Sequence, residues 1–190
     1  MILVNIAGHS TRAKGARAYN GKYEHDYTRG LQQRVTKYAP SFWNVREECE
    51  NMALRDVINF VGEHGYGIDI HFNNNNPLAT GVEVFVNPHT SAKNKLIASL
   101  MVSKVANVLG LPVRRIQSNR SYKYSHESHR GRLAIVDNTK IPFILLEVCF
   151  LNAHDLPIYE QTKDEVAKAI IEAYGIATLG DLDPKTEKRV

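Results

Sequence analysis

Residues 143–147 read FILLE, four apolar residues followed directly by a glutamate. An unbroken apolar run of this length is typical of a strand that is covered on both faces of a sheet. A carboxylate at the end of such a strand is costly to bury unless a cation or a hydrogen-bond donor compensates its charge. The stretch therefore predicts a buried strand with Glu147 in a polar site at its end.

A second stretch, GIDIH at residues 67–71, has the same character. Its apolar residues alternate as in a strand, and His71 stands where that strand should end. The polar run that begins at Asn73 suits neither a strand nor a helix. Because open α/β sheets keep their ligands at the carboxyl ends of strands, we expect His71 to lie in a functional site.

Hydrophobic periodicity predicts an alternation of strands and helices along the rest of the chain. We expect helices at residues 24–38, 52–63, 91–109 and 162–174, and strands at 2–6, 67–70, 81–86, 133–136 and 143–148, with a possible short strand at 42–45. This order predicts an α/β fold: a single domain with a mostly parallel, twisted β-sheet of about five to six strands and helices on both faces. We place the catalytic domain at residues 1–176 and a C-terminal tail at 177–190.

Length and composition narrow the class of protein. The 190 residues suit one domain, and 43% hydrophobic with 23% charged residues is ordinary for a globular chain. No window is apolar enough for a membrane span, and the start MILVNIAGHS does not resemble a signal peptide, so we expect synthesis in the cytoplasm. The two cysteines, Cys49 and Cys149, match no metal or redox spacing.

The net charge of +4 favours contact with polyanions, either nucleic acid or an anionic cell-wall polymer. No basic run is dense enough for a nucleic-acid arm, so we expect no nucleic-acid partner. We take a monomer as the working expectation.

Four polar residues suggest a metal centre. If the strands are parallel, His9, His71 and Glu147 meet at one edge of the sheet, and the loop after residue 10 brings Glu24 beside them. Two imidazoles and one carboxylate form the three-ligand set of a catalytic zinc site, and a further carboxylate can act as general base. Each residue also has an ordinary interpretation: a histidine that holds the scaffold, or a glutamate that favours a helix start. We expect Glu83, which lies between valines, to point to solvent or to a neighbouring strand.

The order of several motifs resembles the zinc-dependent N-acetylmuramoyl-L-alanine amidases of the type 3 class. The segments that carry this resemblance are AGHST, Glu24, IDIHFNNN, TGVEVFV and IPFILLEVCFLNAHD, in this order along residues 2–174. The last is the most specific, because Pro142, Glu147, Phe150 and Asn152 have the spacing of the family's pattern around its catalytic glutamate.

The resemblance implies that His9, Glu24 and His71 bind Zn²⁺ and that Glu147 is the general base. It also implies peptidoglycan as the substrate, cut between N-acetylmuramic acid and the L-alanine of the stem peptide, and is compatible with a phage lysis enzyme that reaches the wall after release. Departures occur at Ile6-Ala7, at Ser10 and at Asp69, where the family usually has serine. These departures affect loop shape and substrate contacts and remove no proposed ligand.

Three alternatives remain open at this stage. The same ligands would serve a carboxypeptidase or a deacetylase that acts on peptidoglycan, and a degenerate domain would bind the wall without catalysis. The ligand assigned to Glu24 could fall on His25 or Asp26 instead. We interpret the other histidines as surface or loop residues, with His126 and His129 near a substrate groove: His64, His89, His126, His129 and His154.

Overall fold

A computed structural model describes residues 1–48, 50–74, 76–114 and 121–178. Within these residues the elements follow in the order β1 (Ile2–Ala7), α1 (Glu24–Tyr38), β2 (Asn44–Glu47), α2 (Leu54–Val61), β3 (Tyr66–Asn73), β4 (Glu83–Val86), α3 (Ala92–Leu109), β5 (Lys123–Tyr124), the short 3₁₀ helix η1 (Ser125–Glu127), α4 (Ala134–Asn138), β6 (Phe143–Phe150) and α5 (Asp155–Thr178).

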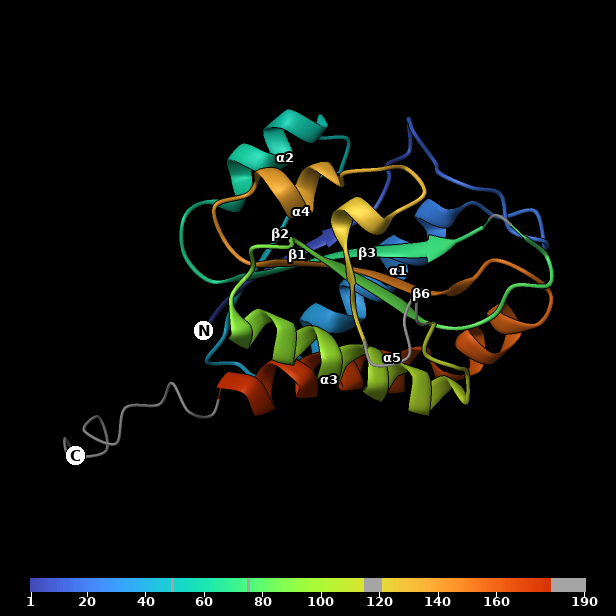
Figure 1. The fold of residues 1–190 in the computed structure, drawn as a ribbon. Helices are drawn as coiled ribbons and strands as arrows, with labels where there is room; N and C mark the ends of the chain where they lie inside the picture. The colour runs from blue at the N-terminus through green and yellow to red at the C-terminus, as the bar shows by residue number, and fades with distance from the viewer. Residues whose placement is uncertain (49, 75, 115–120, 179–190) are drawn as a thin grey trace.

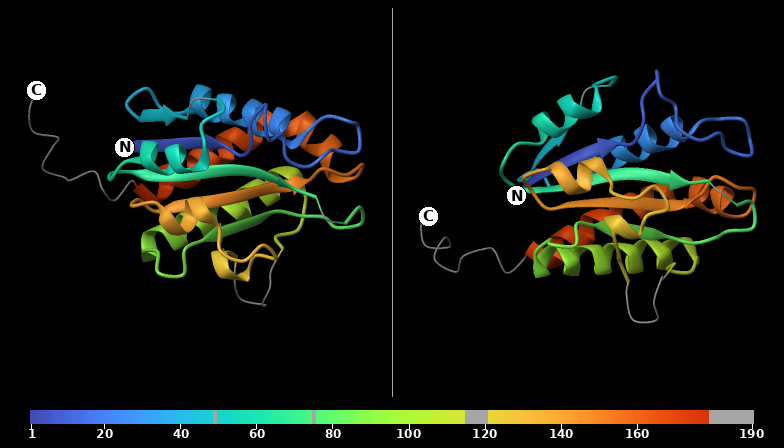
Figure 2. Two further views of the ribbon diagram at one scale, coloured as in Figure 1. Left: turned by 90° about the horizontal axis from the view of Figure 1, so that it is seen from above. Right: turned by 45° about the horizontal axis from the view of Figure 1, so that its top comes forward.

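The strands form one mixed, mostly parallel sheet. In the described part of the chain it has six strands in the order β2-β1-β3-β6-β4-β5. Strands β2, β1, β3 and β6 are parallel to one another, whereas β4 pairs antiparallel with β6. Figure 2 shows β3 and β6 side by side in the middle of the sheet. The predicted single α/β domain is confirmed.

Helices cover both faces of this sheet, as the sequence predicted. Helices α2 and α4 lie on one face, and α3 and α5 lie on the other (Figure 1). Helix α1 packs against β1, β3 and α5, so it belongs to the second layer. Among the described residues, none of the helices combines the length and the apolar character needed to cross a bilayer.

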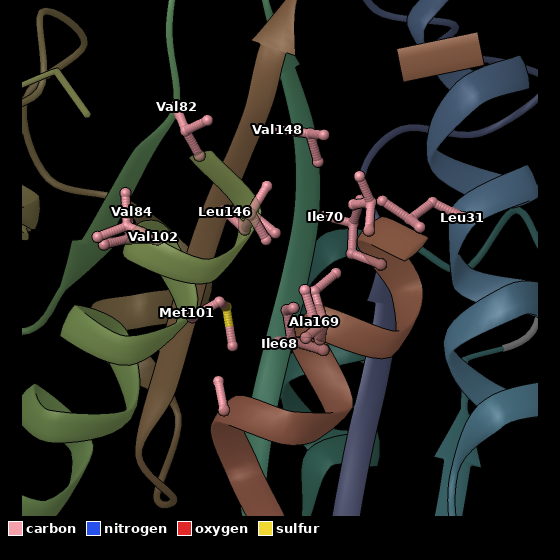
Figure 3. Packing of buried hydrophobic residues seen from close by; sticks show 14 of the residues in the cluster. Leu31, Ile68, Ile70, Val82, Val84, Met101, Val102, Leu146, Val148 and Ala169 are labelled. Carbon is pink, nitrogen blue, oxygen red and sulfur yellow. The ribbon is translucent and has the colours of Figure 1, made fainter. Parts of the chain in front are cut away.

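The main core lies under α1, α3 and α5. Ile68 and Ile70 of β3 and Leu146 of β6 are fully buried there, among the side chains that Figure 3 shows. Each such side chain contributes about 1.5–3 kcal/mol of hydrophobic free energy. A smaller core lies under α2 and α4 and contains Ile6 and Phe143. Because side chains alternate along a strand, the residues between the core positions of β3 and β6 face the α2 and α4 side.

Local signals explain where the first helix begins and ends. Asp26 accepts a hydrogen bond from the backbone N–H of Tyr23 (3.0 Å), and acidic residues in the first turn suit the positive end of the helix dipole. Pro40 follows directly after the C-cap residue Ala39. The predicted bounds of this helix agree with the structure.

Two predictions of secondary structure were wrong. Residues 133–136 do not form a strand: Leu133 is the N-cap of α4 and 134–136 belong to that helix. A run of four apolar residues is too short for its periodicity to distinguish a strand from a helix. Asp137 stabilises this turn of helix by accepting a hydrogen bond from the N–H of Leu133 (3.1 Å). The last helix begins at Asp155 and not at Thr162, because Pro157 lies in its first turn, where a proline is tolerated.

The stretch 113–130, which lies between the elements expected from the sequence, is partly structured, since it contains β5 and the 3₁₀ helix. Its residues 115–120 lie outside the described residues. The last helix continues to Thr178, and residues 179–190 are likewise outside the described part, so the tail boundary stays a prediction.

Candidate metal centre and active site

Three polar residues form a row across adjacent strands. His71 of β3 pairs in register with Glu147 of β6, and Glu147 pairs with Glu83 of β4. Residues that pair directly across strands point to the same face, here the face that carries α2 and α4. Backbone hydrogen bonds of the sheet therefore hold all three side chains beside one another.

His9, Glu24 and His71 form a group whose ligand atoms all lie within 4.8 Å of one another. Glu24 is in the middle: its Oε2 lies 3.0 Å from His9 Nε2, and its Oε1 lies 3.0 Å from His71 Nδ1. His9 follows the end of β1, Glu24 begins α1, and His71 is on β3. The structure thus brings together the three predicted ligands from three elements.

The donor set suits a divalent metal ion. Two imidazole nitrogens and a carboxylate oxygen are the ligand types that catalytic metal sites combine. His9 Nε2 is buried and lacks a hydrogen-bond partner within the described residues, although it lies close to Glu24. A buried nitrogen without a partner is unfavourable in a bare protein, and a metal ion would satisfy it.

Two glycines allow the group to be this compact. A Cβ on Gly8 would lie 2.5 Å from the ring of His71, and a Cβ on Gly15 would lie 2.6 Å from Cδ2 of His9 and 2.7 Å from Oε2 of Glu24. Gly15 also has φ +73°, which favours glycine. His9 itself adopts φ +72°, a conformation that costs of order 1 kcal/mol or more for a residue with a Cβ.

The charges of the group reinforce one another. Burial alone would raise the pKa of Glu24, but hydrogen bonds and charges from His71 and His9 outweigh burial and hold the pKa far below its usual range. Burial alone would lower the pKa of His71, but the carboxylates of Asp69, Glu24 and Glu147 raise it well above its usual value.

Glu147 is the group that the scaffold leaves unsatisfied. Its Oε2 is buried and has no hydrogen-bond partner among the described residues. Burial raises the pKa of Glu147 to about 7; Glu24 and Glu83 add to this shift, whereas His71 and Arg130 oppose it. A carboxylate with a pKa near neutrality is suited to exchange protons with a substrate.

Glu83 points toward the neighbouring strand β5, one of its two predicted orientations, and not toward solvent, the other. It is buried, at 5% exposure, and does not point to solvent. Its carboxylate pairs with Arg114 Nε (2.5 Å) and Lys123 Nζ (2.7 Å) and accepts a hydrogen bond from Asn73 (3.2 Å). The flanking valines indicated a strand, but the two cations come from distant parts of the chain and gave no signal near Glu83.

Two hollows meet at the group formed by His9, Glu24 and His71. One has a volume of about 240 Å³ and is lined by residues that include His71, Glu147, His129 and Arg130. The other, of about 390 Å³, is lined by residues that include His9, Glu48 and His71. His71 lines both hollows, so both lead to the group.

The remaining histidines lie elsewhere. His25, the alternative to Glu24, pairs with Glu50 (3.1 Å), and Asp26 bonds to the helix start. The five histidines interpreted as surface residues are all exposed, and His129 lines the hollow that contains Glu147. The sequence did not indicate that Glu48 is buried and lines the second hollow. Its partners Ala7, Gln32 and Arg29 are far away in the chain, so no local pattern marks it.

Comparison with known families shows which family the chain belongs to. The sequence model of the Amidase_3 family, N-acetylmuramoyl-L-alanine amidase, matches residues 3–175. The chain belongs to this family. The amidase match includes all four predicted site residues, and it establishes peptidoglycan amidase activity as the function of the family.

Solved amidase structures share the fold. An N-acetylmuramoyl-L-alanine amidase from Clostridium difficile 630 has a TM-score of 0.79 at 17% identity, with 95% of this chain and 97% of that chain covered. The catalytic domain of the amidase CwlV from Bacillus (Paenibacillus) polymyxa has a TM-score of 0.73 at 23% identity, with 96% and 99% covered.

The catalytic domain of the CD27L endolysin, which targets Clostridium difficile, has a TM-score of 0.68 at 21% identity, with 90% and 94% covered. At these identities the comparisons establish the fold. A search of curated proteins found no match.

Proposed function

We propose that this amidase is zinc-dependent and cleaves the amide bond between N-acetylmuramic acid and the L-alanine of the stem peptide. The observation that carries the proposal is the group of His9, Glu24 and His71, with Glu147 next to His71 in the sheet register. His₂-carboxylate is a ligand set of catalytic zinc and leaves a position open for water. A zinc ion held there would supply the positive charge that acidifies a water and polarises the amide carbonyl.

The residues of the chain then have separate tasks. Glu147 would accept the proton of the attacking water on its unpartnered Oε2 and return it to the departing amine of L-alanine. Its raised pKa suits both transfers, because the group gains and loses a proton near neutral pH. The hollows on either side of the group would hold the muramic acid and the stem peptide.

Digestion of purified peptidoglycan tests this function. The wild-type protein should contain about one zinc per chain, and mass spectrometry should find stem peptides with a free L-alanine amine beside intact glycan strands. A chelator should stop the reaction, and added zinc should restore it. Release of terminal amino acids or of acetate would instead indicate the carboxypeptidase or the deacetylase.

The variant Glu147→Gln separates catalysis from metal binding. We expect its turnover to fall by roughly 100-fold or more, as loss of a general base predicts, with unchanged zinc content. His71→Ala should lose both zinc and activity. An active Glu147→Gln protein would refute the role of Glu147, and a zinc-binding but inactive wild type would support the degenerate wall-binding domain.

Within this activity we propose a role in phage lysis, with the protein made in the cytoplasm as a monomer. The fold shared with an endolysin catalytic domain supports this role. Cells that express the protein should stay intact until the membrane is permeabilised and should then lyse. Lysis without permeabilisation, or none after it, would contradict the proposal.

A further inference from the structure

Asp69 lies on β3, the strand that also carries His71 of the candidate metal-binding group. It is two residues before His71 on β3, and both side chains line both hollows. Residues two apart on a strand share a face, so Asp69 and His71 point away from the core that contains Ile68 and Ile70. Asp69 is 4% exposed, and a buried carboxylate needs a partner.

That partner is the imidazole of His71. Asp69 Oδ2 lies 3.4 Å from His71 Nε2, whereas His71 Nδ1 lies 3.0 Å from Glu24 Oε1. The two ring nitrogens thus have different neighbours: Nδ1 faces the ligand group, and Nε2 faces Asp69. Within the described part of the chain, the close contact of the Asp69 carboxylate with a basic side chain is the one with His71.

We propose that Asp69 is a positioning residue, which accepts a hydrogen bond from His71 Nε2–H and so leaves the Nδ1 lone pair for zinc. A neutral imidazole carries its proton on one nitrogen, and the partner of that nitrogen selects the tautomer. Carboxylates in this position also make the histidine a stronger ligand. The inference rests on the proposed zinc dependence and explains the use of aspartate where the resemblance gives serine.

A serine hydroxyl at position 69 would be uncharged and shorter than the aspartate. This chain therefore places one more negative charge beside its ligand histidine than the family pattern does. The consequence is a property of this chain: tighter retention of zinc through His71 than a serine at position 69 would give.

Zinc affinity of a substitution series tests the inference. The apparent Kd is measured by competition with a chromophoric chelator for the wild type, Asp69→Ala, Asp69→Asn and Asp69→Ser. We expect affinity to fall roughly 10–100-fold in Asp69→Ala, as for other residues that orient a metal ligand, and less in Asp69→Asn, whose amide oxygen still accepts a hydrogen bond. Asp164→Asn, a change in a partly exposed ion pair with Arg34, is the matched control and should not alter the Kd.

A spectroscopic readout distinguishes positioning from general structural damage. In zinc-loaded protein labelled with ¹⁵N-histidine, long-range ¹H–¹⁵N spectra show which nitrogen of His71 carries the proton. We expect the proton on Nε2 and zinc on Nδ1 in the wild type, and in Asp69→Ala a fraction of the protein with zinc on Nε2 and the proton on Nδ1. Should Asp69→Ala fail to fold, Asp69→Asn and Asp69→Ser give the same comparison.

Two results would overturn the inference: a Kd within twofold of the wild type in folded Asp69→Ala, or zinc bound through Nε2 of His71. Both require a wild type that binds zinc. A wild type without zinc would instead contradict the proposed function, so the two failures are distinguishable.

Discussion

The two faces of the central strands β3 and β6 differ although their residues alternate one by one. On the face under α3 and α5, Ile70 and Leu146 are fully buried among apolar side chains. On the other face, Asp69, His71 and Glu147 are enclosed together, and one oxygen of Glu147 has no partner in the described structure. The comparison shows that the apolar face supplies the folding free energy that offsets the cost of enclosing charges on the site face.

Substitutions at two neighbouring positions of β6 should show the largest difference between the two faces in their effect on the free energy of unfolding. Leu146→Ala should lower the free energy of unfolding by about 2–5 kcal/mol, because it opens a cavity in the main core. Glu147→Gln, one residue later, should not lower it. Urea unfolding monitored by circular dichroism measures both changes. A loss below about 1 kcal/mol in Leu146→Ala would contradict the assignment of the stabilising face.

Gly15→Ala tests how tightly the site face is packed. The new Cβ would lie 2.6 Å from His9 and 2.7 Å from Glu24, so the ligands must move, and we expect zinc affinity to fall roughly tenfold or more. Gly21→Ala is the matched control: Gly21 also has positive φ, at +88°, but its Cβ would meet nothing closer than Arg17 at 3.6 Å. Equal affinity losses in the two variants would show that backbone strain, and not contact with the ligands, is responsible.

The pH dependence of stability sharpens the comparison. Glu147 has a folded-state pKa of about 7 against an ordinary value of 4.5, so between these values the folded protein binds more protons than the unfolded chain. Relative to Glu147→Gln, the wild type should therefore lose about 1–3 kcal/mol of stability as pH rises through this window, and keep it below pH 4.5. Thermal unfolding in chelator at several pH values measures this difference. A constant difference would contradict the raised pKa.

The smallest change in stability is expected for an ion pair between α3 and α5, on the side of these helices away from the sheet. Lys104 of α3 and Glu172 of α5 form an ion pair at 3.0 Å, in which Lys104 is partly exposed and Glu172 is exposed. Lys104→Ala should change the free energy of unfolding by less than about 0.5 kcal/mol and leave zinc affinity unchanged. Urea unfolding checks the first value, and a change above about 1 kcal/mol would mean that this pair contributes to holding α3 against α5.

Much of the fold could be predicted from the sequence because its signals are local. The apolar run at 143–146 and the alternation at 67–70 identify the central strands, and α1 has the predicted bounds. The error at 133–136 arises because four apolar residues suit a helix or a strand equally, and packing against the sheet decides between them.

Those residues of the candidate site that lie at the end of a strand or at the start of a helix could be predicted from the sequence. Parallel strands bring His9 and His71 to one edge, and Glu24 starts a helix beside them. The cations around Glu83 and the contact of Asp69 with His71 depend on side-chain geometry across strands, which no local pattern encodes. The metal and the roles of the four residues remain predictions.

The register of His71, Glu147 and Glu83 has a consequence for evolution. Strand spacing in the sheet, about 4.8 Å, holds the proposed ligand His71 and the proposed general base Glu147 together independently of the loops that border the hollows. Segments such as 17–22 and 125–133 are therefore free to diverge while these side chains keep their places, whereas Gly15 must stay a glycine. We expect chimeras that exchange these segments with a relative to digest walls of different bacteria while retaining zinc.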